Sequence, residues 1–127
     1  MVTYRNFING KWVESESTRT FANTNPANTD DVLGTIRQAT REEARTAVEA
    51  ASEAFHSWRK TPAPTRGKIV AKAARLMEEA KEELAQILTR EEGKTLGESR
   101  GEVQRSINVA EFCAGESRRM NGETIFS

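Results

Sequence analysis

Residues 89–99, TREEGKTLGES, determine which of two folds this chain can have. Gly93-Lys94-Thr95 matches the end of the phosphate-binding motif G-x-x-x-x-G-K-[ST], whose backbone N–H groups surround a phosphate. That motif also needs a glycine five residues before Gly93 and a buried strand in front of it. The sequence has Leu88 there, preceded by a helical pattern, and Glu91 and Glu92 would repel a polyanion. We therefore interpret the stretch as a joint between two helices.

Helical signals surround this joint. Thr40 and Glu43 fit a capping box at the start of a first helix. Pro62 and Pro64 suit its end and the first turn of the next helix. The first helix has one stripe predicted to be buried: Ala44, Ala47, Val48, Ala51, Phe55 and Trp58. The second has another: Ile69, Ala73, Leu76, Met77, Ala80, Leu84, Ile87 and Leu88.

Breaks and ends of the later helices can also be predicted. The charged residues 78–83 favour a kink or a brief break in the second helix. Gly93 suits the position after its C-terminus. A third helix is predicted over residues 96–120, closed by Gly122, with an apolar stripe that comprises Val103, Ile107, Ala110 and Ala114.

The first 40 residues favour strands instead. Asn9-Gly10 is a hairpin-type turn between two short β-prone runs. Two further strands are predicted over residues 19–24 and 32–38. The turn between them is predicted at Asn25-Pro26 and residues 28–31.

Composition excludes several classes of function. The 127 residues contain 19 Lys plus Arg and 19 Asp plus Glu, which leaves no basic surface for nucleic acid or an anionic membrane. No apolar run approaches the ~20 residues that span a bilayer, and the N-terminus lacks a signal-peptide pattern. We expect a cytoplasmic chain. Its 36% hydrophobic content is low, so we expect part of its core to lie elsewhere.

Candidate catalytic residues are few. His56 has no second ligand at metal-binding spacing, so a solvated histidine is the better interpretation. Cys113, the single cysteine, is interpreted as a half-buried packing residue. The sequence has no G-x-G-x-x-G motif. These residues alone therefore predict no catalytic centre and no metal site.

Taken in order, five groups of segments resemble the opening of the NAD(P)-dependent aldehyde dehydrogenases, in particular those acting on semialdehydes. They are FINGKWV (7–13), NPAN (25–28) with VLGTIRQAT (32–40), residues 42–79, residues 82–103 with the E-x-G-K joint, and AEFCAGESRRMNGETI (110–125). The resemblance implies an α/β fold: an N-terminal β-hairpin and short strands, then three long helices. Residues 1–127 would be the N-terminal segment of a Rossmann-like cofactor domain, without the catalytic and oligomerisation parts.

The same resemblance implies the activity. In this family a cysteine thiolate attacks the aldehyde, hydride passes to NAD or NADP, and a glutamate-activated water hydrolyses the thioester. Those residues are expected beyond Ser127, and Cys113 does not match the nucleophile. We therefore expect this chain alone to be inactive and to bind no cofactor. The parent enzyme is expected to be a homo-oligomer, a dimer or tetramer, with a small aldehyde as substrate and no nucleic acid or membrane partner.

Two substrate-binding residues follow from the resemblance. The family's third helix lines the substrate tunnel, and the matching positions are Arg105 and Gly101. Arginine there would suit a carboxylate or phosphate on the far end of the substrate, which implies a semialdehyde such as α-ketoglutaric or succinic semialdehyde. The alternative is that Arg105 pairs with Glu98 or Glu102 on its own helix. The family's monovalent-cation site would match backbone oxygens near Thr24 and the side chain of Glu91, but the sequence does not establish it.

A second class of function stays open, namely a stand-alone, non-catalytic helical interaction module. Such a module should carry polar residues on exposed stripes, whereas this chain has apolar ones: Ile69, Leu76, Leu84, Ile87 and Val103. The stripes therefore favour the dehydrogenase. The choice between NAD and NADP cannot be predicted from these residues.

Overall fold

The computed structural model describes residues 3–122 and residue 125, so the predicted segment limits at Met1 and Ser127 lie outside the described residues. The chain divides into two compact units. The first comprises residues 1–60 and 87–94, and the second comprises residues 61–86 and 95–127. Strands lie in the first unit and helices in both, so the predicted α/β class is confirmed.

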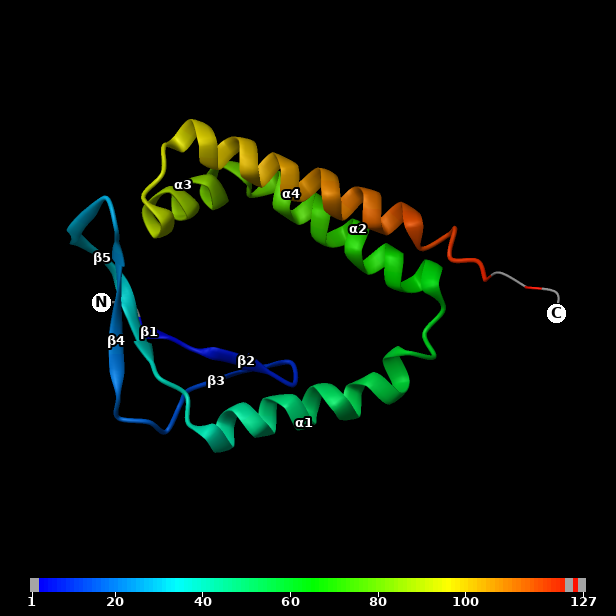
Figure 1. Ribbon diagram of the computed structural model, residues 1–127, viewed down its shortest axis with the longest axis horizontal. Coiled ribbons are helices and arrows are strands. Elements are labelled where there is room, and N and C mark those ends of the chain that lie inside the picture. The colour runs from blue at the N-terminus through cyan, green and yellow to red at the C-terminus, as the bar shows by residue number, and fades with distance from the viewer. Residues whose placement is uncertain (1–2, 123–124, 126–127) are drawn as a thin grey trace. The chain divides into compact units, whose positions relative to one another are not determined.

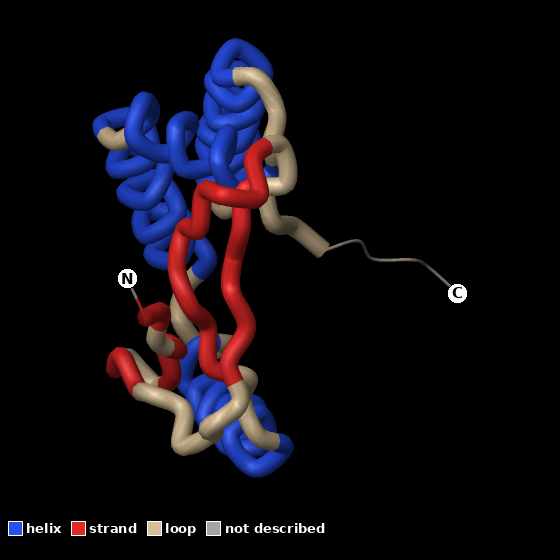
Figure 2. Tube along the Cα trace, turned by 90° about the vertical axis from the view of Figure 1, so that its left-hand side faces the viewer, coloured by secondary structure: helices blue, strands red, loops and turns tan. Residues whose placement is uncertain are grey.

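The first unit contains two small sheets. Its strands are β1 (Thr3–Tyr4), β2 (Asn6–Ile8), β3 (Lys11–Val13), β4 (Thr20–Asn25) and β5 (Asn28–Arg37). One sheet has the order β1-β5-β4, with β1 parallel and β4 antiparallel to β5. Figure 2 shows β4 and β5 as the two long strands that run side by side. The other sheet is the β2–β3 hairpin.

The predicted Asn9-Gly10 turn is confirmed. Both residues have positive φ, 50° for Asn9 and 75° for Gly10, as a two-residue hairpin of the right twist requires. Across this hairpin the rings of Phe7 and Trp12 lie 5.0 Å apart between centroids. The turn chemistry and this aromatic pair fix the register of β2 on β3.

The turn between β4 and β5 is tighter than predicted. It lies at Pro26-Ala27, as the Asn25-Pro26 signal indicated, but residues 28–31 belong to β5 and the prediction of a turn there was wrong. The Asn25 side chain accepts a hydrogen bond from the Ala27 N–H at 3.0 Å, so one asparagine is enough to close the turn. Asp31 is held in the strand by contacts from a distant helix, described below.

Helix α1 (Arg41–Trp58) begins at the predicted capping box. The Thr40 hydroxyl accepts a hydrogen bond from the Glu43 N–H, and the Glu43 carboxylate accepts one from the Thr40 N–H at 2.7 Å. Glu43 also accepts hydrogen bonds from the Ser15 hydroxyl and the Glu16 N–H. These bonds, with that from the Thr40 backbone the strongest cause, lower the pKa of Glu43 below its usual value.

The apolar stripe of α1 is not buried, contrary to prediction. No residue of α1 is buried, and Val48 and Phe55 expose 69% and 56% of their surface. The apolar periodicity correctly predicted that these residues form a helix. Periodicity does not show whether another part of the chain packs against the apolar stripe.

The joint at residues 89–99 is confirmed as a connection between helices. Helix α3 (Lys81–Glu92) ends there and α4 (Leu96–Glu116) begins after it, capped by Thr95. Gly93 has φ 73°, and its N–H donates to the Thr89 carbonyl. The Lys94 ammonium lies 2.5 Å from a Glu92 carboxylate oxygen. A phosphate cradle would need both groups free, so the nucleotide-loop interpretation fails.

This joint is fastened to the β4–β5 hairpin. The Arg90 guanidinium donates two hydrogen bonds to the Asp31 carboxylate, at 3.0 and 2.6 Å. The Glu91 carboxylate accepts a hydrogen bond from the Asn23 side chain at 3.1 Å. A Cβ added at Gly93 would lie 3.0 Å from the Ala27 nitrogen, so the joint approaches the hairpin turn at backbone distance.

The second unit is helical. Helix α2 (Ala63–Glu79) begins after Pro62 and has Pro64 in its first turn, as predicted. The predicted break falls at Ala80, so α2 and α3 are separate helices. The described residues therefore form four helices rather than the predicted three.

Helices α2 and α4 lie side by side (Figure 1) and make the core of this unit. Val103 and Ile107 of α4 are buried, as predicted, but α2 buries Gly67 and Ala74 instead of the predicted Ile69 and Leu76. The reason is close helix packing. A Cβ at Gly67 would lie 2.6 Å from the Ser117 Cβ, which leaves no room for large side chains on this face.

Helix α4 ends earlier than predicted. Its last residue is Glu116, and Ser117 is the C-cap, whereas the sequence favoured residue 120 with Gly122 as closure. The Ser117 hydroxyl donates to the Ala114 carbonyl at 2.7 Å, which satisfies one of the last helical carbonyls.

The Gly93 backbone yields a first prediction. Gly93→Ala should lower the free energy of unfolding by about 1–2 kcal/mol for the left-handed backbone alone, and further because the new Cβ meets Pro26 and Ala27. Gly97→Ala is the matched control, since a Cβ there meets nothing within 4 Å. Urea denaturation followed by circular dichroism would measure both. Equal stability of the two variants would contradict the close approach.

The pKa of Glu43 yields a second prediction. Because folding lowers this pKa from 4.5, ionised Glu43 stabilises the fold above about pH 4.5, and the contribution is lost as pH falls through the folded value. Glu43→Gln should therefore reduce stability at pH 7 and differ less from the wild type at acidic pH. Thermal melts between pH 7 and pH 3 would test this. Glu49→Gln, exposed on the same helix, should keep the wild-type dependence.

Candidate functional site

The two predicted substrate-binding residues lie on the exposed face of α4. Arg105 follows Gly101 by four residues in one continuous helix, so both lie on the same side of it. A Cβ at Gly101 would meet nothing within 4 Å, so the space beside Arg105 is open. Val103 and Ile107 point the other way, into the contact with α2.

Arg105 itself is exposed. Among residues 3–122, its guanidinium makes no hydrogen bond or salt bridge, including with Glu98 or Glu102. An arginine donates through five N–H groups in a planar fork that matches a carboxylate. The geometry leaves that fork available to a ligand, while the recognition role of Arg105 and Gly101 stays a prediction.

Sequence reasoning missed a polar network beside Arg105. The Lys81 ammonium at the start of α3 donates to the Gln104 side-chain oxygen. The Gln104 amide nitrogen in turn donates to the Asn108 side-chain oxygen at 2.9 Å. The i, i+4 spacing of Gln104 and Asn108 is a signal for their own contact, but no local pattern could connect them to Lys81.

A second contact holds the first turn of α3 on α4. The Arg100 guanidinium donates two hydrogen bonds to the Glu82 carboxylate, at 2.8 and 2.7 Å. The hydrogen bonds from Arg100 lower the pKa of Glu82, and those same bonds raise the pKa of Arg100. Both side chains are about half exposed, so this pair orients the two helices more than it stabilises them.

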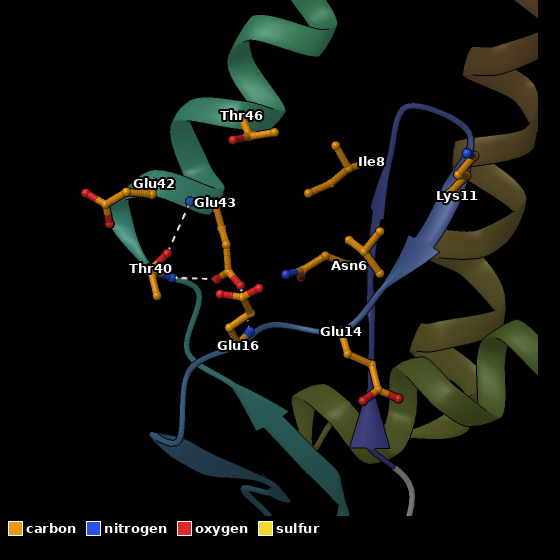
Figure 3. Close-up of a pocket in the computed structure, with 10 residues that line it drawn as sticks. Asn6, Ile8, Lys11, Glu14, Glu16, Thr40, Glu42, Glu43 and Thr46 are labelled. Carbon is orange, nitrogen blue, oxygen red and sulfur yellow. Dashed lines mark hydrogen bonds between the residues drawn. The ribbon is translucent and has the colours of Figure 1, made fainter.

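A hollow of about 360 Å³ lies in the first unit, between the β2–β3 hairpin and the start of α1 (Figure 3). Its lining residues are Asn6, Ile8, Lys11, Val13, Glu14, Glu16, Thr40, Glu42, Glu43 and Thr46. The Glu43 carboxylate accepts three hydrogen bonds from Thr40, Ser15 and Glu16. Glu43 is therefore engaged in holding the start of α1, and its hydrogen bonds give it a structural role.

The other residues considered from the sequence do not assemble into a catalytic centre. Cys113 is exposed on α4, so the prediction of a half-buried thiol was wrong. His56 is exposed on α1. Within the described residues, no three His, Cys, Asp or Glu side chains gather closely enough to hold a metal ion.

The structure does bring together the two segments matched to the family's cation site. Glu91 accepts its hydrogen bond from Asn23, the residue before Thr24 in β4. Nearby, the hydrogen bonds from Arg90, and then from Asn25, lower the pKa of Asp31. These contacts join side chains within the protein, so they explain how the joint is held.

Of the described helices, none combines the length and apolar character needed to cross a bilayer.

Relatives of known function match almost the whole chain. A malonate-semialdehyde dehydrogenase of Geobacillus kaustophilus is 48% identical over 123 residues, and an α-ketoglutaric semialdehyde dehydrogenase of Bacillus subtilis is 44% identical over 123. Each alignment covers 97% of this chain and 25% of the relative. The chain thus spans about a quarter of the length of the curated relatives it matches.

Solved structures of other aldehyde dehydrogenases are also similar to this chain. The betaine aldehyde dehydrogenase of Staphylococcus aureus, solved with NAD+, has a TM-score of 0.90 and 39% identity, covering 97% of this chain and 25% of its own. A benzaldehyde dehydrogenase of Corynebacterium glutamicum, described as NAD-dependent, has a TM-score of 0.89 and 33% identity, covering 97% and 27%.

The model of the aldehyde dehydrogenase family matches residues 12–127. This match begins within β3 and spans the β4–β5 hairpin, the four described helices and the E-x-G-K joint, in the order expected from the sequence. The chain therefore belongs to the aldehyde dehydrogenase family.

Proposed function

We propose that these residues form the N-terminal segment of the cofactor domain of an enzyme that oxidises a carboxylate-bearing semialdehyde to the acid, with NAD or NADP as hydride acceptor. The observation that carries the proposal is the exposed guanidinium of Arg105 beside the open position at Gly101. The relatives at 48% and 44% identity, both named as semialdehyde dehydrogenases, support the substrate class.

In this proposal α4 supplies recognition and orientation. The Arg105 fork binds the carboxylate at the far end of the substrate through two parallel N–H···O bonds. Gly101, one turn earlier, leaves room for the chain that joins this carboxylate to the aldehyde. A substrate held at its tail presents its aldehyde at a fixed distance, which lowers the entropy cost of the reaction.

The nicotinamide cofactor accepts hydride when bound, but the residues of this chain do not fit it. The sequence has no G-x-G-x-x-G turn. The space beside Gly93, whose joint resembles a phosphate loop, is filled by Pro26 and Ala27. Binding of the cofactor and the choice between NAD and NADP are therefore assigned to residues outside this chain, as are the nucleophile and the general base.

The remaining parts of the proposal concern the whole enzyme. It would act in the cytoplasm as a homo-oligomer, a dimer or tetramer, on a small aldehyde and without a nucleic-acid or membrane partner. The balanced charge of the chain supports only the expectation of no nucleic-acid or membrane partner.

The recognition role of Arg105 can be tested in the enzyme that contains this segment. Arg105→Leu should lower kcat/KM for a carboxylate-bearing semialdehyde roughly 10- to 100-fold, because a hydrogen bond to a charged group contributes about 1.5–3 kcal/mol. A plain aldehyde of similar length should be affected little. Arg105→Lys should recover part of the loss, since it keeps the charge but not the fork.

Steady-state kinetics of both variants on both substrates would measure this difference. Equal losses on the two substrates would show that Arg105 has a structural role, and the semialdehyde assignment would then fail. Glu111→Gln, exposed on the same helix, is the matched control for a change of charge on α4.

The absence of catalytic residues gives a separate prediction. The purified 127-residue chain should not oxidise any aldehyde in the presence of NAD or NADP, because its single thiol, Cys113, is exposed on α4 and does not match the family's nucleophile. Absorbance of the reduced nicotinamide would follow the reaction. Turnover that survives Cys113→Ser would overturn the assignment of catalysis to residues outside this chain.

A further inference from the structure

We propose that Asn108 is a second recognition residue for the substrate carboxylate, and that Lys81, acting through Gln104, orients its side-chain amide. The inference rests on the proposed function, because it concerns the same ligand group as Arg105. It goes beyond that function in naming the polar relay that selects an anionic tail over a neutral one.

Asn108 lies on the same part of the α4 surface as Arg105. It follows Arg105 by three residues and Gly101 by seven, and both spacings place side chains on one face of a helix. Asn108 is exposed, like Arg105 and Gly101. The opposite face of α4, with Val103 and Ile107, is occupied by the contact with α2.

The relay starts with a group that can only donate. A lysine ammonium has three N–H donors and no acceptor. Its contact with Gln104 must therefore be made to the amide oxygen, which is the geometry observed. This fixes which end of the Gln104 amide faces α3.

The second amide is then fixed by the first. With its oxygen on Lys81, Gln104 presents its NH₂ group to Asn108, and the Gln104 nitrogen lies 2.9 Å from the Asn108 side-chain oxygen. The Asn108 side-chain oxygen therefore already accepts a hydrogen bond within the protein. Its own NH₂ group, with two donors, is left for a ligand beside Arg105.

The position of Lys81 is itself held. The neighbouring Glu82 receives both hydrogen bonds of the Arg100 guanidinium, at 2.8 and 2.7 Å, and Arg100 lies one turn before Gln104 on α4. This pair keeps the first turn of α3 beside α4, so the ammonium stays within reach of Gln104. An NH₂ group and a guanidinium fork on one helix face then offer several donors to one ligand, which suits an anion.

The direct test is Asn108→Asp in the enzyme that contains this segment. The change keeps the shape but replaces the donor pair with a carboxylate that faces the substrate carboxylate. We expect kcat/KM for the carboxylate-bearing semialdehyde to fall tenfold or more, mainly through KM, and to change little for a plain aldehyde of equal length. Glu78→Gln, an isosteric change at an exposed position of α2, should leave both values unchanged.

The relay is tested by a double-mutant cycle. Lys81→Met frees the Gln104 amide to turn over and should lower kcat/KM for the carboxylate substrate by about two- to tenfold, the scale of one ordinary hydrogen bond. In an Asn108→Ala background the same change should have no further effect, because Lys81 acts only through Asn108. Additive losses would overturn the relay.

The outcomes separate this inference from the proposed function. If Arg105→Leu does not discriminate between the two substrates, the proposed substrate class fails. If Arg105→Leu discriminates but Asn108→Asp lowers both activities equally or neither, only the assignment of Asn108 fails.

Discussion

The approach of Gly93 to the β4–β5 turn is the constraint on which the first unit depends. A side chain at Gly93 would lie 2.9 Å from Pro26 and 3.0 Å from the Ala27 nitrogen, and its φ of 73° is one that other residues rarely adopt. Glycine thus lets the end of α3 come to backbone distance from the hairpin. The paired hydrogen bonds between Arg90 and Asp31, 59 residues apart in sequence, then fix the direction of that approach. Asp31 consequently lies in a strand although its neighbours favour a turn.

In the second unit, small side chains likewise allow two helices to approach closely. Gly67 faces Ser117 so closely that no Cβ fits, and this closeness buries Val103 and Ile107 of α4. One face of α4 is thereby fixed against its neighbours and the other is left exposed, with Arg105 on it. A recognition group on a rigid helix can be positioned more closely than one on a loop, and the contacts from α3 extend this order to the polar side chains beside it.

Many large apolar side chains are exposed. Among the described residues, the buried apolar ones are Ala74, Ala85, Val103 and Ile107, all in the second unit, and only two of these are large. The exposed large ones among the described residues include Val48, Phe55, Trp58, Ile69, Leu76 and Phe112. Exposed large apolar side chains in such number are typical of a chain that contacts other protein. It agrees with a chain that spans a quarter of the length of its relatives.

The sequence by itself determined the helical segments, the Asn9-Gly10 hairpin, the capping box at Thr40 and the family, because capping, turn chemistry and periodicity act over a few residues. It also placed Arg105 and Gly101 on one helix face. Only the tertiary structure decided which apolar residues are buried, that residues 28–31 are a strand, and that Lys81 orients Gln104. The physical reason is distance along the chain. Burial depends on which surface packs against a helix. A hydrogen bond between residues 23 positions apart cannot be predicted from a local sequence pattern.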